Sequence, residues 1–373
     1  MGSSARLIAR IDLDRLVANW RNLNTLSGQA EASAVIKADA YGHGVEMVGR
    51  ALYQAGCRVF FTASINEAVL LRSHLGKAVI GYFDGLHAED TEAVRAYDIW
   101  PAISSPGQMD LLADMARRHG NPIPAMLQID TGMNRLGAGP DRLDELASSE
   151  KLNAGDWKLI FSHLASADDP QSAQSETQRA AFDRVRRLFP SIPASLAATG
   201  GIALGPAFHY QMTRPGIGIY GLPPLPSLAP HLNPALSLHA RVLEIRQAKA
   251  GEHVGYNATA TLGRDTRLAT VAGGYADGVR RQLSNKGTVH KDGFAAPVIG
   301  RVSMDTTIVD ITDWPENHLA PGDWLDLIHD GYTADDMARD SDTIGYDILT
   351  TLGLRAKRQY AGRIMAEFEN QDR

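Results

Sequence analysis

Lys37 has the clearest potential for chemistry in this sequence. It follows the apolar run 34–36 and opens the segment KADAYGHG, in which Gly42 and Gly44 predict a turn before a helix. Burial at the end of a strand can lower the pKa of a lysine enough to make its amine a nucleophile or a base. Such an amine can hold an aldehyde cofactor as a Schiff base. The alternative is a solvated lysine at a strand end, and the residues around Lys37 decide between the two.

Four other residues with potential for chemistry also follow apolar runs. They are Asp130, His163, Thr199 and Arg214. Their carboxylate, imidazole, hydroxyl and guanidinium groups can bind anions or move protons, but a lone histidine is more often a satisfied core residue. Whether these groups form one site depends on the elements that carry them.

Eight short apolar runs alternate with amphipathic stretches between residues 33 and 220, which predicts parallel strands covered by helices. Helices are expected at 14–26, with Asp14 as the N-cap, and for example at 66–75 and 106–119. Eight strands suggest a closed barrel, whose active site lies at the carboxyl ends of its strands. All five candidate residues stand at such ends, which favours the barrel over a doubly wound open sheet. The predicted strands are 33–37, 59–63, 78–82, 99–103, 124–129, 158–162, 194–198 and 211–214.

A second domain follows a stretch rich in proline. Residues 222–230 contain four prolines, which predicts an interdomain linker. Beyond it, short apolar runs bounded by Gly, Pro and Asp predict a mostly β domain with one helix near 343–352. The expected fold class is α/β, a (β/α)8 TIM-type barrel over residues 1–225 followed by a mostly β C-terminal domain over residues 226–373. The predicted strands of the second domain are 237–245, 268–272, 296–299, 306–311 and 324–328.

Composition narrows the functional classes. The chain has 373 residues, of which 44% are hydrophobic, and a net charge of −6, so two globular domains are expected and a nucleic-acid partner is not. No apolar run approaches the roughly 20 residues of a membrane helix, and residues 1–14 lack a secretory signal, so we expect a cytoplasmic protein without a membrane partner. The single cysteine, Cys57, excludes an internal disulfide and a thiolate zinc site, and no metal is expected.

The segment AVIKADAYGHG resembles the pyridoxal-phosphate attachment segment of the alanine racemase family. Further segments resemble that family in the family's order along almost the whole chain. One such match could arise by chance, but the series is specific. Its other members are DTGMNRLG (130–137), SHLA (162–165), TRPGIGIYG (213–221), GYNAT (255–259), GYADG (274–278) and GRVSMD (300–305).

The resemblance implies an enzyme that interconverts L-alanine and D-alanine with pyridoxal 5'-phosphate. Removing the proton from Cα requires an electron sink and a base on each face, and the cofactor is the sink. Lys37 matches the lysine that carries the cofactor and acts as one base. Tyr256 matches the tyrosine that a second subunit contributes as the other base, which implies a homodimer with shared active sites. Both D-alanine biosynthesis and alanine catabolism are open as the cellular role.

Arg214 bears on the type of reaction. It matches the family arginine that donates to the pyridine nitrogen, and an arginine cannot hand over its proton, so the ring stays largely unprotonated. Decarboxylases of the same architecture carry a carboxylate at that position, so Arg214 favours racemisation. His163 matches the histidine that links this arginine to the tyrosine base.

The remaining matches concern the cofactor phosphate and the substrate. Tyr41, Thr199, Gly216 and Ile217 match phosphate contacts. Arg135, Met304 and Asp305 match residues around the substrate carboxylate, and Tyr275 matches an aromatic residue of the entry corridor. Residues 216–221 also satisfy GxGxxG, but prolines follow in place of a helix, so a dinucleotide fold is not expected.

Three positions depart from the family pattern. Gln128 stands where many members have a carbamylated lysine that pairs with the arginine matching Arg135, and the hypothesis is that a chloride ion takes its place. Ala198 replaces a common asparagine, and Leu354 replaces a common tyrosine. Both changes remove hydrogen-bonding groups, so they bear on cofactor affinity and on the range of side chains accepted.

The sequence leaves three alternative functions to be weighed. A racemase of broader specificity is compatible with the Leu354 change. A pyridoxal-phosphate-dependent decarboxylase is disfavoured by Arg214, and a non-catalytic pyridoxal-phosphate-binding protein has no use for the β domain that carries Tyr256.

Overall fold

The computed structural model describes residues 5–139 and 150–371. Its chain forms two compact units. The barrel unit comprises residues 15–40 and 44–233, and the β unit comprises residues 1–14, 41–43 and 234–373. The proline-rich stretch belongs to the barrel unit up to Asn233, whose amide donates to Asn19 Oδ1 at 2.8 Å.

The barrel unit contains the predicted parallel strands in chain order. Seven of them form one sheet, and β10 pairs with β2 in parallel. Backbone bonds join the two sheets, because Gln211 N donates to Ala194 O at 3.1 Å and Val35 N donates to Pro215 O at 2.9 Å. The predicted barrel-type fold class is therefore confirmed. The strands are β2 (Glu31–Ala32), β3 (Ala34–Val35), β4 (Val59–Thr62), β5 (Val79–Tyr82), β6 (Ile99–Ile103), β7 (Ile123–Gln128), β8 (Gly155–Phe161), β9 (Ala194–Ser195) and β10 (Met212–Thr213).

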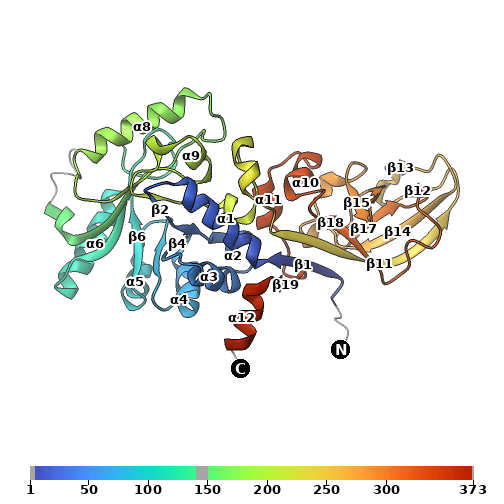
Figure 1. Ribbon diagram of the computed structural model, residues 1–373, viewed down its shortest axis with the longest axis horizontal. Helices are drawn as coiled ribbons and strands as arrows, with labels where there is room; N and C mark the ends of the chain where they lie inside the picture. The colour runs from blue at the N-terminus through green and yellow to red at the C-terminus, as the bar shows by residue number, and fades with distance from the viewer. Residues whose placement is uncertain (1–4, 140–149, 372–373) are drawn as a thin grey trace. The chain divides into compact units, whose positions relative to one another are not determined.

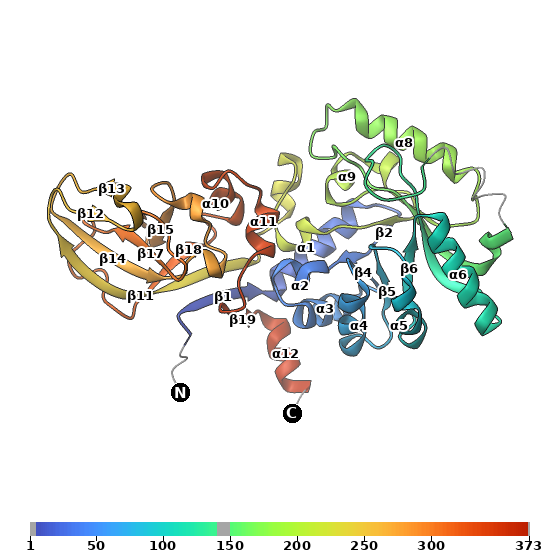
Figure 2. The ribbon, with the colours of Figure 1, turned by 180° about the vertical axis from the view of Figure 1, so that it is seen from behind.

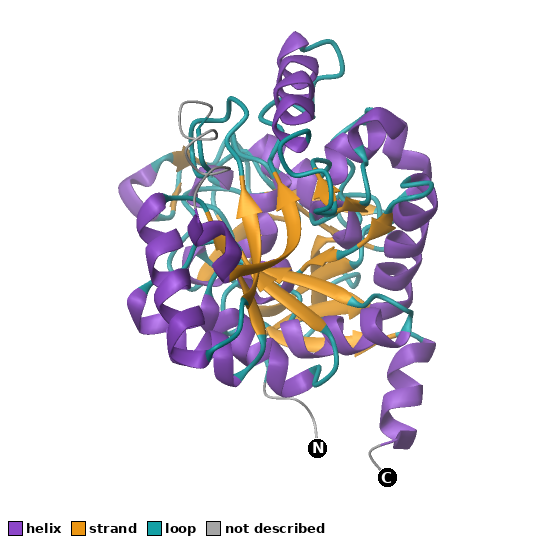
Figure 3. Ribbon diagram, turned by 90° about the vertical axis from the view of Figure 1, so that its left-hand side faces the viewer, coloured by secondary structure: helices purple, strands orange, loops and turns teal. Residues whose placement is uncertain are grey.

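Helices surround these strands (Figure 3), and α3, α4 and α5 follow one another side by side along the sheet (Figure 1). The predicted helices at 66–75 and 106–119 are present as α4 and α6. Ser64 and Ser105 cap them, each hydroxyl accepting from an amide three residues later at 3.4 Å. The helices are α1 (Leu13–Leu26), α3 (Val45–Gln54), α4 (Ile65–His74), α5 (Thr91–Ala96), α6 (Pro106–His119), α8 (Ala173–Arg186) and α9 (Thr199–Ala203).

The predicted N-cap at Asp14 is wrong. Asp14 lies inside α1, and its carboxylate accepts from the amides of Arg363 at 2.8 Å and Ile364 at 3.2 Å. These amides begin α12 (Arg363–Gln371), so Asp14 stabilises a helix that is distant in the sequence. Among the residues described, no helix is both long and apolar enough to cross a membrane.

The β unit is built on an eight-stranded sheet (Figure 2). The long strand β11 pairs antiparallel with β1, β14 and β18, and all five predicted strands of this region are found. The sequence did not predict β1, β15 and β19, nor helix α10 (Ala334–Asp340) before α11 (Gly345–Thr350). The sheet contains β1 (Leu7–Asp12), β11 (Leu236–Ala248), β14 (Thr266–Ala272), β15 (Thr288–Lys291), β16 (Phe294–Pro297), β17 (Thr306–Asp310), β18 (Trp324–Ile328) and β19 (Lys357–Ala361).

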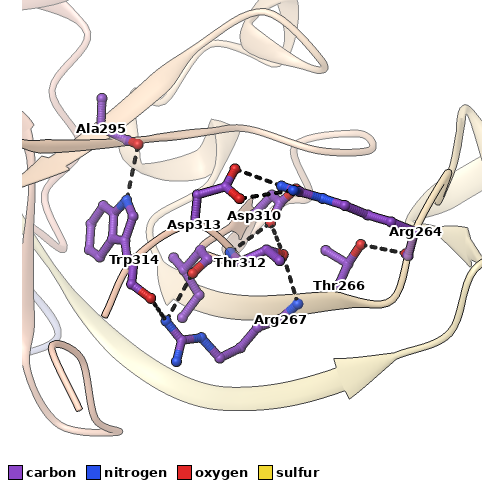
Figure 4. Close-up of polar contacts among 9 residues, drawn as sticks. Arg264, Thr266, Arg267, Ala295, Asp310, Thr312, Asp313 and Trp314 are labelled. Atoms are coloured by element: carbon purple, nitrogen blue, oxygen red, sulfur yellow. Dashed lines mark hydrogen bonds and ion pairs between the residues drawn. The ribbon is translucent and has the colours of Figure 1, made fainter. Parts of the chain in front are cut away.

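Arg267 fastens the loop that follows β17 (Figure 4). Its guanidinium donates to four backbone oxygens of residues 311–316, the shortest of these bonds being 2.6 Å to Trp314 O. Trp314 in turn donates from Nε1 to Ala295 O at 3.0 Å on β16. Nearby, Arg264 pairs with Asp313 at 2.6 Å, but both of these side chains are exposed.

Replacing Arg267 with methionine should lower the free energy of unfolding by about 2 kcal/mol, because it removes several charge-assisted hydrogen bonds to one loop. Urea denaturation of the variant and the parent measures this loss. Arg264→Met is the matched control and should lose less stability, because its exposed ion pair is screened by solvent. Equal losses in the two variants would contradict this account of the loop.

Candidate active site

Lys37 begins α2 (Lys37–Tyr41), a turn with left-handed backbone angles. Residues 38–41 have φ values between 51° and 53°, which cost about 1–2 kcal/mol per non-glycine residue. Two carboxylates hold the turn in place: Glu67 accepts from Ala38 N at 2.7 Å, and Asp39 accepts from the first amide of α3 at 2.8 Å. The predicted turn after the strand is therefore present, and it fixes the point from which the lysine side chain departs.

The surroundings of Lys37 favour its neutral amine. Burial lowers the pKa of Lys37, and the positive charge of Arg135 lowers it further, while Glu67 and Asp84 act in the opposite direction. The net shift is downward. A larger fraction of the amine is thus unprotonated at neutral pH than for a solvated lysine, as a nucleophile or base requires.

Asp130 shapes the loop that carries Arg135. Its Oδ1 accepts from the amides of Gly132, Met133 and Asn134 at 2.8, 2.9 and 3.2 Å. A Cβ at Gly137, where φ is 126°, would lie 2.4 Å from Asp130 N, so the loop returns tightly over the end of β7. Asp130 thus organises the backbone around Arg135.

Gln128 lies at the end of β7 and is only 6% exposed. Its Nε2 donates weakly to Leu136 O at 3.4 Å, and its Oε1 has no hydrogen-bond partner within the described ranges. Across those same ranges, no carboxylate forms an ion pair with Arg135. The site therefore contains an incompletely satisfied amide and an arginine that lacks an acidic partner.

His163 lies two residues after the end of β8 and is half-buried. Burial lowers the pKa of His163 to about 3, and the positive charges of Arg214, Arg135 and Lys37 contribute in that order. The imidazole is therefore neutral at physiological pH. It can donate one hydrogen bond and accept another, as a residue between two polar groups must.

The depressed pKa of His163 makes stability depend on pH. Below pH 6.5 His163 becomes protonated in the unfolded chain, whereas in the folded chain it stays neutral until the pH approaches 3. The contribution of His163 to the free energy of unfolding is therefore complete above pH 6.5 and decreases as the pH falls towards 3. Between pH 7 and pH 5 the loss should be about 2 kcal/mol. Urea denaturation of the cofactor-free protein and of its His163→Gln variant at both pH values measures it. An equal pH dependence in the two proteins would contradict a neutral imidazole in the folded chain.

Arg214 follows β10 and is only 3% exposed. Its guanidinium donates to Ser195 Oγ and, at 2.5 Å, to Ser162 O, and it lies over the Phe161 ring with a centroid distance of 5.0 Å. Burial lowers the pKa of Arg214 to about 9, so the group remains charged at neutral pH. No carboxylate in the described part of the chain pairs with it. A buried guanidinium whose acceptors are all neutral is suited to donate a hydrogen bond to a ligand atom that is not acidic.

Thr199 connects two short helical turns at the ends of β9 and β10. Its Oγ1 accepts from Gly216 N at 3.1 Å and Gly218 N at 3.3 Å, which ties α9 to η5 (Ile217–Tyr220). Neither N-cap residue, Ala198 or Gly216, caps its turn with a side chain of its own. A Cβ at Gly218 would lie 2.6 Å from Thr199 Cγ2, so only glycine permits this approach. The sequence-predicted residues Thr199, Gly216 and Ile217 are thus brought together.

The β unit holds the other predicted residues. Tyr256 begins the turn η7 (Tyr256–Ala258) and is 69% exposed, and its hydroxyl forms no hydrogen bond to any residue described. Tyr41 is buried and its ring lies 6.3 Å from that of Tyr346, and burial strongly raises the pKa of its phenol. Tyr41 therefore stays protonated and can donate a hydrogen bond.

Tyr275, Met304 and Asp305 lie on two segments of the β unit that pair closely. Tyr275 N donates to Ser303 O at 3.0 Å, and a Cβ at Gly274 would lie 2.3 Å from the same oxygen. Asp305 pairs with Arg355 at 2.7 Å. Met304 and Tyr275 are exposed by 52% and 45%. The three predicted residues thus form one exposed group.

Two family models match the chain, the alanine racemase N-terminal domain over residues 11–224 and the alanine racemase C-terminal domain over residues 235–360. The chain belongs to the alanine racemase family. An alanine racemase of Methylobacterium nodulans is 42% identical over 94% of this chain and 95% of its own length. The biosynthetic alanine racemase of Agrobacterium fabrum is 40% identical over 95% of this chain and 94% of its own.

A solved alanine racemase from Bartonella henselae, with covalently bound pyridoxal phosphate, matches with a TM-score of 0.92 and 38% identity over 96% of this chain and 100% of that one. The alanine racemase of Streptomyces coelicolor matches with a TM-score of 0.90 and 30% identity over 96% and 98%. These relatives confirm the predicted family and the predicted class of enzyme, a pyridoxal-phosphate-dependent alanine racemase.

Sequence reasoning missed two polar side chains beside the predicted site residues of this alanine racemase family member. Arg355 donates to both oxygens of Asp277 at 2.7 and 2.8 Å as well as to Asp305. Its only local signal is its place after the exposed Leu354. Gln178 contacts the loop that carries His163, and a polar residue on the buried face of α8 was its signal.

Proposed function

We propose that this chain interconverts L-alanine and D-alanine through Lys37 and Tyr256, with pyridoxal 5'-phosphate as its cofactor. The observation that carries the proposal is that a lysine whose pKa is lowered and a buried arginine that no described carboxylate neutralises both follow strands of the barrel. The arginine separates this function from decarboxylation, which would be served by a carboxylate at position 214. A racemase of broader specificity is the second candidate, because Leu354 is 93% exposed and lacks a hydroxyl.

The residues fit the cofactor. When bound, pyridoxal phosphate withdraws electrons from the substrate Cα and so stabilises the charge left by proton removal. Lys37 would hold it covalently, and Arg214 would donate to its ring nitrogen. The turns at Thr199, Gly216 and Ile217, together with the Tyr41 hydroxyl, would bind its phosphate.

Two residues would move the proton. The Lys37 amine removes it from Cα on one face or returns it there, and the Tyr256 phenol does so on the other face. His163 is neutral and would join Arg214 to the phenol by hydrogen bonds. Arg135, Met304 and Asp305 would surround the substrate carboxylate, and Tyr275 would line its entry.

The proposal includes a homodimer in which a partner contributes Tyr256. The exposed phenol of Tyr256 supports the shared site. A catalytic base must face a substrate, and within the described residues the chain that carries Tyr256 leaves its phenol uncovered. Exposed apolar side chains on the same unit also support an interface, namely Ile344 at 62%, Met304 at 52% and Leu354 at 93%. As a division of the sequence, we assign the lysine-bearing barrel domain to residues 1–225 and the tyrosine-bearing β domain to residues 226–373. The two compact units depart from this division at residues 1–14, 41–43 and 226–233. A cytoplasmic location completes the proposal, with D-alanine biosynthesis and alanine catabolism as the two candidate roles.

A chloride ion between Gln128 and Arg135 is part of the proposal, because within the described residues the arginine lacks an acidic partner and Gln128 Nε2 makes a single long hydrogen bond. Replacing chloride by a large non-coordinating anion should lower kcat/KM for alanine by about 2- to 10-fold. Gln128→Glu supplies a fixed anion and should make the activity insensitive to chloride. Equal wild-type activity in both salts would remove the ion from the proposal.

Incubating L-alanine with the cofactor-loaded protein in deuterated water tests the proposed reaction. Loss of optical activity with deuterium entering Cα is expected. Release of carbon dioxide would establish a decarboxylase instead, and a bound cofactor without exchange at Cα would establish a carrier. Chiral analysis of the products from serine and from larger amino acids decides between the narrow and the broad specificity.

A further inference from the structure

Gln178 is a buried amide on α8 that the proposed mechanism does not use. It is 1% exposed and lies on the core-facing side of the helix with Ser175, Phe182 and Val185. An amide in such a position costs free energy unless its polar atoms are bonded. Its contacts therefore indicate why a glutamine occupies this core position.

Both polar atoms of the Gln178 amide form hydrogen bonds. Its Oε1 accepts from Ala165 N at 2.8 Å, and its Nε2 donates to His163 O at 2.9 Å and to Thr131 Oγ1 at 3.3 Å. The two ends of the amide cannot be exchanged, because the N–H groups must face acceptors and the carbonyl oxygen must face a donor. One side chain thus fixes the loop after β8 at two points and the loop after β7 at a third.

A hydrogen-bonded path leads from this amide to Arg214. Because Thr131 Oγ1 accepts from Gln178, its own proton is available to Ser162 Oγ, which lies 2.8 Å away. Ser162 O in turn accepts from the buried guanidinium of Arg214 at 2.5 Å. Ser162 and His163 are adjacent in the chain, so the contacts of Gln178 reach the backbone that holds both the arginine and the histidine.

We infer that Gln178 is a positioning residue for racemisation, which sets the places of His163 and Arg214 from outside the barrel strands. This inference rests on the proposed function. Its effect is on geometry: the amide defines the height and rotation of residues 162–165, and thereby the direction in which Arg214 donates. A displacement of about 1 Å at such a site can cost about 100-fold in rate.

The same helix provides a matched control. Gln174 lies one turn before Gln178 and also joins these loops, since its Oε1 accepts from Ser166 Oγ at 2.6 Å and its Nε2 donates to Gly132 O at 3.3 Å. It is exposed, so water can replace its bonds. Both glutamines therefore join the two loops, but of the two only Gln178 contacts the His163 backbone.

The test compares Gln178→Met and Gln174→Met in the cofactor-loaded enzyme. For Gln178→Met, kcat for L-alanine should fall about 10- to 100-fold while KM changes less than about threefold, and for Gln174→Met both should stay within about twofold of the wild type. Two readouts besides activity are expected to move only in Gln178→Met: the absorption spectrum of the bound cofactor, because Arg214 faces its ring, and hydrogen exchange at the Ala165 amide, which should accelerate. Equal kcat values and equal spectra for the two variants would overturn the inference.

Two further variants keep the test decisive if Gln178→Met does not fold. Gln178→Glu retains the shape and the acceptor for Ala165 N but loses the donors to His163 O and Thr131 Oγ1. Thr131→Val removes the link between Gln178 and Ser162 and leaves the bonds of Gln178 to His163 O and Ala165 N in place. Both should lower kcat with little change in KM, and an unchanged kcat in both would overturn the inference. If the wild type fails to racemise alanine, the proposed function falls instead, and the cofactor spectrum and the Ala165 exchange then decide the role of Gln178.

Discussion

Replacing Lys37 with alanine should lower the racemisation of alanine by at least about 10⁴-fold and abolish covalent attachment of the cofactor. The side chain is the only group in the proposed site that can both bind an aldehyde covalently and move a proton, and the left-handed turn fixes where it departs from the backbone. Mass spectrometry after borohydride reduction measures the attachment, and a chiral assay measures the rate.

Lys37→Arg separates the charge of this residue from its chemistry. It keeps a cation next to Arg135 but has no amine that can be deprotonated, so it should be as inactive as Lys37→Ala. Lys77→Ala, at an exposed position outside the site, is the control and should retain full activity. An active Lys37→Arg enzyme would show that only positive charge is needed at this position, against the account given above.

Replacing Tyr256 with phenylalanine should lower kcat by about 10²- to 10⁴-fold and leave the cofactor attached. The two bases serve opposite faces, so the loss has a signature of its own. Lys37 should still exchange the Cα proton of one enantiomer with solvent deuterium, while the other enantiomer, whose proton faces position 256, exchanges far more slowly.

Deuterium incorporation into each enantiomer separately, followed by mass spectrometry, measures this asymmetry. Tyr97→Phe removes another exposed phenol and should change neither rate. If Tyr256→Phe slowed exchange of both enantiomers equally, Tyr256 would be acting on something other than one face of the substrate.

The fold was largely predictable because its strands are buried apolar runs followed by turn residues, as at Val59–Thr62 and Trp324–Ile328. The sequence did not predict β19, Lys357–Ala361, because it is largely polar and contains no fully buried residue, and it is a strand only through its pairing with β1 at the other end of the chain. The capping role of Asp14 was missed for the same reason, since its partners lie about 350 residues away.

The positions of the site residues were predictable to the level of strand ends, where the structure places Lys37, Asp130, His163, Thr199 and Arg214. Their environment was not. Neither alanine nor aspartate predicts the positive φ values of residues 38–40, which the surrounding hydrogen bonds impose. The low pKa of His163 results first from burial and then from the positive charges of Arg214, Arg135 and Lys37, and no local sequence pattern predicts that these residues meet.

In the proposed enzyme, one active site takes Lys37 from one chain and Tyr256 from another. Mixing the inactive Lys37→Ala and Tyr256→Phe proteins under conditions that exchange subunits tests it directly. A hybrid dimer with shared sites contains one site with both residues intact, so random mixing should restore roughly a quarter of wild-type activity. If the mixture stays as inactive as its components although hybrid dimers form, the two residues act within one chain and the shared-site account is wrong.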